Sequence, residues 1–60
     1  GTDESFDIER DLDPDVAETI YANMGGNISA TARELKSEGH IPSEVTRYYV
    51  EKFLNNHNIA

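Results

Sequence analysis

The chain has 60 residues, carries a net charge of −7 at pH 7 and contains no cysteine. This length allows one small domain, and the lack of thiols excludes disulfides and thiolate metal sites. No apolar run approaches the roughly 18 residues that a membrane-spanning helix needs. We therefore expect an intracellular protein, in the cytoplasm, nucleoid or nucleus, without a membrane partner.

The negative charge is concentrated at the N-terminus, where residues 1–15 contain seven acidic residues and one arginine. Residues 1–12 also lack a helical period, so we expect an acidic, flexible arm in solvent. The alternative is that Phe6, Ile8 and Leu12 pack onto the rest of the chain or onto a partner. Because the chain begins with glycine rather than methionine, we also expect a fragment of a larger protein.

A first helix is predicted to start after Asp13. The Asp13 carboxylate can cap it, Pro14 suits the first helical position, and apolar residues then recur at three- and four-residue spacing as far as Met24. Gly25 and Gly26 predict its end, because glycine accepts the left-handed conformation that follows a helix.

A second helix follows, capped by Asn27 or Ser29. Its apolar residues recur on one face, and Gly39 is its natural stop. A turn comes next, in which Ile41 enters the core and Pro42 restricts the backbone.

A third helix is predicted to begin at Ser43 as its cap, although the preceding proline can instead be its first residue. Val45, Tyr49 and Phe53 recur at four-residue spacing and form its expected buried face. The polar run at residues 55–58 predicts fraying there.

These elements predict an all-α fold with a three-helix bundle over residues 13–56, an arm at 1–12 and a frayed C-terminus at 57–60. The second and third helices form a helix-turn-helix, a unit whose second helix commonly enters the major groove of DNA. The expected core residues are Val16, Ile20, Met24, Ile28, Ala32, Leu35, Ile41, Val45, Tyr49 and Phe53.

The segment Gly26–Leu35, followed by Ile41-Pro42 and by Arg47–Val50, resembles the homeodomain-like helix-turn-helix family. That family includes domains of transposases, resolvases, phage small-terminase subunits and Fis-related bacterial factors. The resemblance spans residues 16–54 and implies that the third helix reads DNA. The residues that it places toward the bases are Ser43, Glu44, Thr46 and Arg47.

Two features depart from the family pattern. The family passes from the leucine to the isoleucine through a single glycine, whereas this chain inserts residues 36–40. This insertion predicts a longer second helix and an unusual angle of the third. The family also often has a buried aliphatic residue where this chain has Thr46, with Val45 apolar instead, so the register of the third helix is open by about one residue.

Arg47 is the first candidate for DNA contact, because its guanidinium can pair with guanine or grip a phosphate. The alternative is a surface arginine paired with Glu44 or Glu51. Ser43 and Thr46 can contact a phosphate or a base edge, and Ser43 can equally be only a helix cap. The further candidates for backbone contact, each otherwise a solvated charge, are Arg33, Lys36, His40 and Lys52.

We expect no enzyme, because catalytic carboxylates need fixed positions and a pocket, and the two histidines lack metal-ligand spacing. We also expect no metal, cofactor or small-molecule substrate. The main hypothesis is a module that binds double-stranded DNA. The alternative is an acidic protein-interaction or oligomerisation module, in which the arm and an exposed Val50 and Leu54 contact another chain. A homo-oligomer fits either hypothesis.

Overall fold

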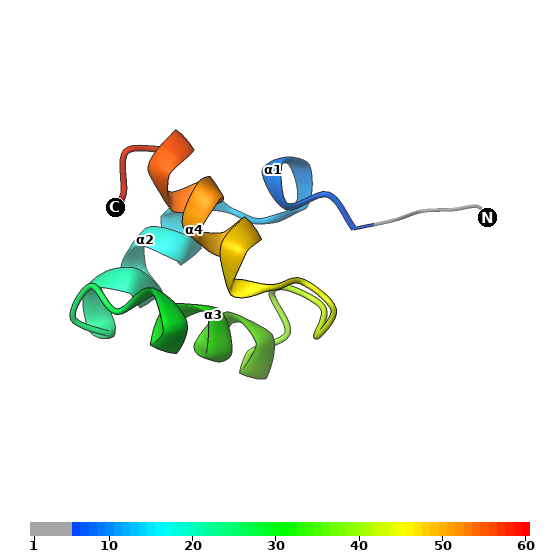
Figure 1. Cartoon of the computed structure of the whole chain (residues 1–60), viewed down its shortest axis with the longest axis horizontal. Coiled ribbons are helices and arrows are strands. Elements are labelled where there is room, and N and C mark those ends of the chain that lie inside the picture. The colour runs from blue at the N-terminus through cyan, green and yellow to red at the C-terminus, as the bar shows by residue number, and fades with distance from the viewer. Residues whose placement is uncertain (1–5) are drawn as a thin grey trace.

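A computed structural model describes residues 6–60 of the chain. Four helices follow one another in these residues: α1 (Ile8–Asp11), α2 (Pro14–Asn23), α3 (Ile28–Ser37) and α4 (Arg47–Asn56). α2 and α4 both pack on α3, and the one-turn α1 packs on α4 (Figure 1). The all-α prediction is confirmed, and no strand occurs in the described residues.

Side chains cap the first three helices at their N-termini. The carboxylates of Asp7 and Asp13 and the amide oxygen of Asn27 each accept a hydrogen bond from a first-turn backbone N–H, over 2.9 to 3.1 Å. Such bonds satisfy donors that have no partner within the helix. The caps predicted at Asp13 and Asn27 are confirmed, as is Pro14 at the first helical position of α2.

α2, α3 and α4 all end in a Schellman motif. The left-handed residues are Gly25 (φ 68°), Gly39 (φ 81°) and Asn58 (φ 58°). In each motif the next backbone N–H donates to the carbonyl five positions back, over 2.8 to 3.0 Å. The predicted ends at Gly25 and Gly39 are confirmed. Whereas the sequence predicts fraying at residues 55–58, α4 continues to Asn56 and then closes in this cap.

α4 begins later than the predicted third helix. Its N-cap is Thr46, which makes no side-chain capping bond, and its first helical residue is Arg47. A turn comes before it, closed by a 3.1 Å hydrogen bond from the Val45 N–H to the Pro42 carbonyl. The prediction of Ser43 as the cap is therefore wrong, because this turn occupies the residues that the predicted first turn would use.

The buried face of α4 also differs from the prediction. Val50, Phe53 and Leu54 are fully buried, whereas Tyr49 is 51% exposed. Tyr49 in the core, and Val50 and Leu54 on the surface, are therefore wrong predictions. Since Val45 precedes the helix, four-residue spacing counted from it does not describe one helical face; the buried residues instead follow i, i+3, i+4 spacing.

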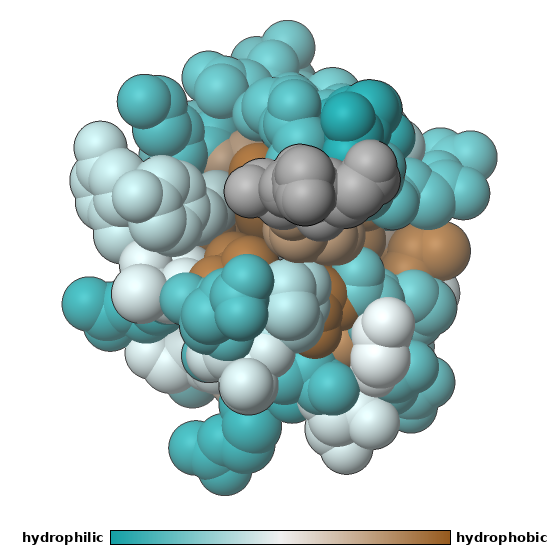
Figure 2. Space-filling model, turned by 90° about the vertical axis from the view of Figure 1, so that its right-hand side faces the viewer, coloured by the Kyte–Doolittle hydropathy of each residue, from teal (hydrophilic) through white to brown (hydrophobic). Residues whose placement is uncertain are grey.

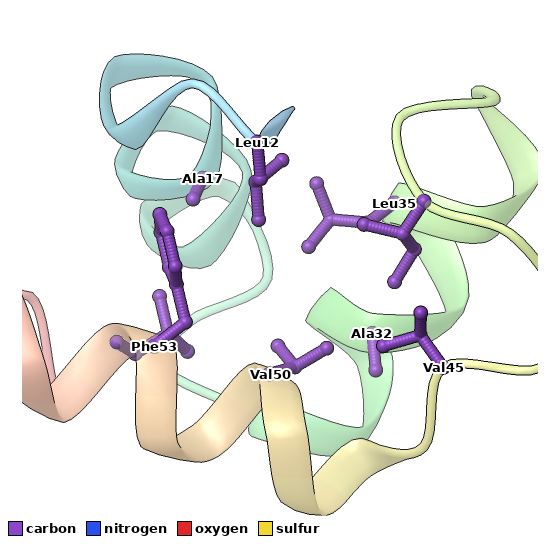
Figure 3. Packing of buried hydrophobic residues seen from close by; sticks show 9 residues of the cluster. Leu12, Ala17, Ala32, Leu35, Val45, Val50 and Phe53 are labelled. Atoms are coloured by element: carbon purple, nitrogen blue, oxygen red, sulfur yellow. The ribbon is translucent and has the colours of Figure 1, made fainter. Parts of the chain in front are cut away.

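The core forms where α2, α3 and α4 meet. Figure 3 shows Phe53 of α4 extending toward Ala17 of α2, and Val50 lying opposite Ala32 of α3. Three predicted core residues, Val16, Ile20 and Ile28, are half-buried and packed against it, and Met24, the C-cap of α2, is half-buried. The complete set of buried apolar residues is Leu12, Ala17, Ala32, Leu35, Ile41, Val45, Val50, Phe53 and Leu54.

The segment just before α2 takes part in this packing. Leu12 is 3% exposed within the core, and Phe6 and Ile8 are partly buried against it. Figure 2, seen from the right of Figure 1, shows hydrophobic side chains at the centre of this end of the molecule, bordered by hydrophilic ones. For residues 6–12 the structure therefore shows the packed alternative rather than an arm in solvent, and the prediction for residues 1–5 lies outside the described residues.

Candidate nucleic-acid interface

Arg47 reaches from the first turn of α4 to the first turn of α3. Its Nη1 donates a hydrogen bond to the Ser29 Oγ over 3.2 Å, and both side chains are exposed. Among the described residues, Arg47 forms no ion pair with the flanking Glu44 or Glu51. Its charge is therefore not neutralised by a local carboxylate and remains accessible to a ligand.

Two further cations share the face of α3 that Arg47 contacts. Arg33 and Lys36 follow Ser29 by four and seven residues, which places all three side chains on one side of the helix. Arg33 is exposed and Lys36 is half-buried. Arg33, Lys36 and Arg47, together with Ser29, form what we call the α3/α4 basic surface.

The outer face of α4 carries two exposed tyrosines, Tyr48 and Tyr49, of which Tyr49 was predicted in the core. Tyr48 is 62% exposed and Tyr49 51% exposed. Their rings meet edge to face with centroids 5.4 Å apart. The Lys52 Nζ lies 6.0 Å from the Tyr48 ring centroid, at the outer limit of a cation–π contact. Tyr48 and Lys52 therefore add an aromatic ring and a cation to the outer face of α4.

The other predicted contact residues divide between two places. Ser43 and Thr46 are exposed in the connection just before Arg47. His40 instead lies against α2, where it lines an open hollow together with Asp15 and Glu38. The structure thus groups Ser43 and Thr46 with the start of α4 but does not bring His40 to the α3/α4 basic surface.

Glu9 of α1 lies at the opposite end of α4 from Arg47. One Glu9 carboxylate oxygen accepts a 3.2 Å hydrogen bond from the Asn56 Nδ2, and the other lies 3.0 Å from the His57 Nε2. The hydrogen bond from Asn56, followed by the contact with His57, lowers the pKa of Glu9. A ten-residue helix is about 15 Å long, so Glu9 lies more than a Debye length at physiological salt from the backbone of Arg47.

Asp11, the other acidic residue of α1, is paired locally. The Asp11 carboxylate pairs with the Arg10 guanidinium at 2.8 Å and accepts a 3.0 Å hydrogen bond from the Asp7 backbone N–H. These contacts, the Arg10 hydrogen bond first, lower the pKa of Asp11 to about 2. Part of the acidity of the chain is therefore balanced within α1.

The described residues contain no group of three or more side chains placed to hold a metal ion. Within the same part of the chain, every helix is too short or too polar to cross a bilayer. Comparisons with protein-family models, with curated proteins and with solved structures return no significant match. The resemblance to the homeodomain-like family therefore stays a prediction.

Proposed function

We propose that this chain is a DNA-binding module of the helix-turn-helix type, with α4 as its recognition helix and duplex DNA as its partner. The observation that carries the proposal is the hydrogen bond from Arg47 to Ser29. This bond holds the Arg47 side chain against the face of α3 that carries Arg33 and Lys36. Cations gathered on one face are the electrostatic footprint of a nucleic-acid binder.

The side chains divide by role. Arg47, at the exposed start of α4, is suited to a guanine edge or a phosphate. Arg33 and Lys36 are suited to phosphates, which position a protein on the duplex without reading sequence. Thr46 and Ser43, beside Arg47, supply hydroxyl donors for the same backbone.

The connection between α3 and α4 is longer than the three- or four-residue turn of a typical helix-turn-helix. It nevertheless returns α4 onto α3, and the two helices pack directly against each other. The extra residues form the Gly39 cap and the turn that ends at Val45. α3 and α4 can therefore present one shared surface to DNA although the connection between them is long.

The net charge of −7 predicts weak binding without long-range steering. The test is fluorescence anisotropy with a labelled random-sequence duplex at about 20 mM and about 150 mM salt. We expect measurable binding that falls steeply with salt. Arg47→Ala is expected to weaken it about tenfold and to reduce the salt slope by about one.

Arg10→Ala is the matched control, because it removes the same charge from α1 and should leave the duplex affinity within about twofold. Absence of binding at the lower salt, or equal losses in both variants, would contradict the proposal.

A second candidate function is a protein-interaction surface on the outer face of α4. Tyr48 and Tyr49 are its specific support, because two adjacent exposed tyrosines are typical of contact surfaces. The version that uses Val50 and Leu54 is excluded by their burial. Sedimentation of the chain and of Tyr48→Ala/Tyr49→Ala tests self-association at this surface: a mass above the monomer that the double variant abolishes would support it.

A further inference from the structure

An open hollow lies between α2 and the end of α3, away from the α3/α4 basic surface. Its lining residues are Asp15, Val16, Thr19, Ile20, Glu38 and His40. α4 contributes none of them, so a ligand in the hollow and a ligand on α4 use different residues. Binding in the hollow is therefore independent of the proposed DNA contact.

The floor of the hollow is apolar. Val16 and Ile20 stand one turn apart on α2, and both are half-buried and packed against the core. Because they line the hollow, the exposed part of each side chain remains in contact with solvent. Covering this aliphatic surface is favourable at about 25 cal/mol per Å².

The rim of the hollow is acidic on both sides. Asp15 borders it from α2 and Glu38 from the end of α3, and no lysine or arginine is among its described lining residues. Glu38 is the C-cap of α3, where the helix dipole is negative. A hydrogen bond with Glu38, then burial, and then the charge of Glu38 raise the pKa of Glu34 one turn earlier. Negative charge is thus crowded where α3 ends, and an incoming cation would relieve it.

We propose that this hollow docks a basic amphipathic segment of a partner protein, with an aliphatic side chain on Val16 and Ile20 and a lysine or arginine between Asp15 and Glu38. Charge complementarity selects this occupant over an acidic or phosphate-bearing one, which the two carboxylates would repel. The apolar floor selects an amphipathic segment over a purely polar basic one.

The test uses the whole chain, labelled with ¹⁵N, and a short amphipathic peptide built from leucine and lysine. When this peptide is added, we expect the changes in the backbone amide shifts of the labelled chain to concentrate at Thr19, Ile20 and His40. Replacing every lysine of the peptide by glutamate should abolish these shifts, and replacing every leucine by alanine should weaken binding at least about fivefold. Equal shifts with the glutamate peptide, or shifts centred elsewhere, would overturn the proposal.

A charge-matched pair of variants separates the hollow from the general acidity of the chain. Asp15→Asn/Glu38→Gln is expected to weaken the lysine–leucine peptide at least about fivefold, whereas Asp7→Asn/Glu51→Gln should leave it within about twofold. Both variants replace each carboxylate by an amide of nearly the same size whose oxygen still accepts a hydrogen bond. We therefore expect folding to be preserved, which the dispersion of the amide spectrum checks. Equal affinity for the two variants would overturn the proposal.

Discussion

The Arg47 guanidinium and the Ser29 hydroxyl are joined by a 3.2 Å hydrogen bond that connects the first turn of α4 to the first turn of α3. Both groups are exposed, so the bond adds little to the stability of the fold. Its effect is on the position of the guanidinium. An arginine that is already oriented loses less side-chain entropy when it grips a phosphate.

Ser29→Ala should therefore weaken duplex binding about two- to fivefold while leaving the free energy of unfolding within about 0.5 kcal/mol of the parent chain. Anisotropy and urea denaturation measure the two quantities. Ser37→Ala, at the other end of α3, is the control and should change neither. If Ser29→Ala binds the duplex as tightly as the parent chain, the hydrogen bond has no part in DNA recognition.

The register of α4 is tested by comparing a buried with an exposed position. Leu54→Ala should destabilise the fold by about 2–5 kcal/mol, because it leaves a cavity in the core. Tyr49→Ala should cost less than about 1 kcal/mol, since its ring is half in solvent. Urea denaturation followed by circular dichroism gives both values, and the reverse order would support the register predicted from the sequence.

The helix ends provide a backbone test that involves no packing. Gly39 has φ 81° and open space around the position of an added Cβ, so Gly39→Ala should cost about 1–2 kcal/mol through the left-handed backbone alone. Asn58 adopts the same conformation at the end of α4, and Asn58→Gly should be neutral or slightly stabilising. A thermal denaturation temperature that is lower for Asn58→Gly than for Gly39→Ala would contradict a Schellman cap at both helix ends.

Acid should weaken the N-terminal part of the fold. The pKa of Asp11 falls from 3.8 to about 2 on folding, so the unfolded chain takes up this proton at a higher pH than the folded chain. The stabilisation that ionised Asp11 provides through its contacts is complete above about pH 4 and is lost as the pH falls through about 2. The pKa of Glu9 is also lowered in the folded chain, so protonation of Glu9 likewise destabilises the fold in acid. Thermal denaturation between these pH values should show a flatter dependence for Asp11→Asn than for Glu18→Gln, and parallel curves would contradict the Asp11 contacts.

Local signals account for what the sequence predicted correctly. The caps at Asp13 and Asn27 and the ends at Gly25 and Gly39 each depend on residues within one turn, and the structure has all four. The left-handed Asn58 is a weaker form of the glycine signal, which explains why a cap was not predicted there.

Tertiary context decided what the sequence did not predict. Val50 and Leu54 compete with Tyr49 for the buried face of α4, and the outcome depends on the turn before Arg47, which delays the start of the helix. α1 is too short for periodicity, and Leu12 beside it is buried in a core cluster that it shares with residues of α2, α3 and α4. These interactions join residues that are far apart in the chain, so they cannot be predicted from the spacing of neighbouring residues.

The contact between Ser29 and Arg47 likewise depends on tertiary packing and could not be predicted from local spacing. The sequence offered Ser29 as a candidate helix cap and Arg47 as a DNA contact or surface arginine, but only the packing of α3 on α4 brings their side chains within 3.2 Å. From the sequence, Arg33, Lys36 and His40 were separate candidates. The fold places Arg33 and Lys36 on one side of α3 and His40 in the hollow beside α2.

The most direct test of the proposed function is an amide-shift map of the ¹⁵N-labelled chain with an unlabelled duplex at low salt. We expect the largest shifts to fall at Ser29, Arg33, Arg47 and Tyr48, and to shrink together as salt is raised. A spectrum unchanged by excess duplex, or shifts confined to α1 and α2, would contradict DNA binding through the α3/α4 basic surface.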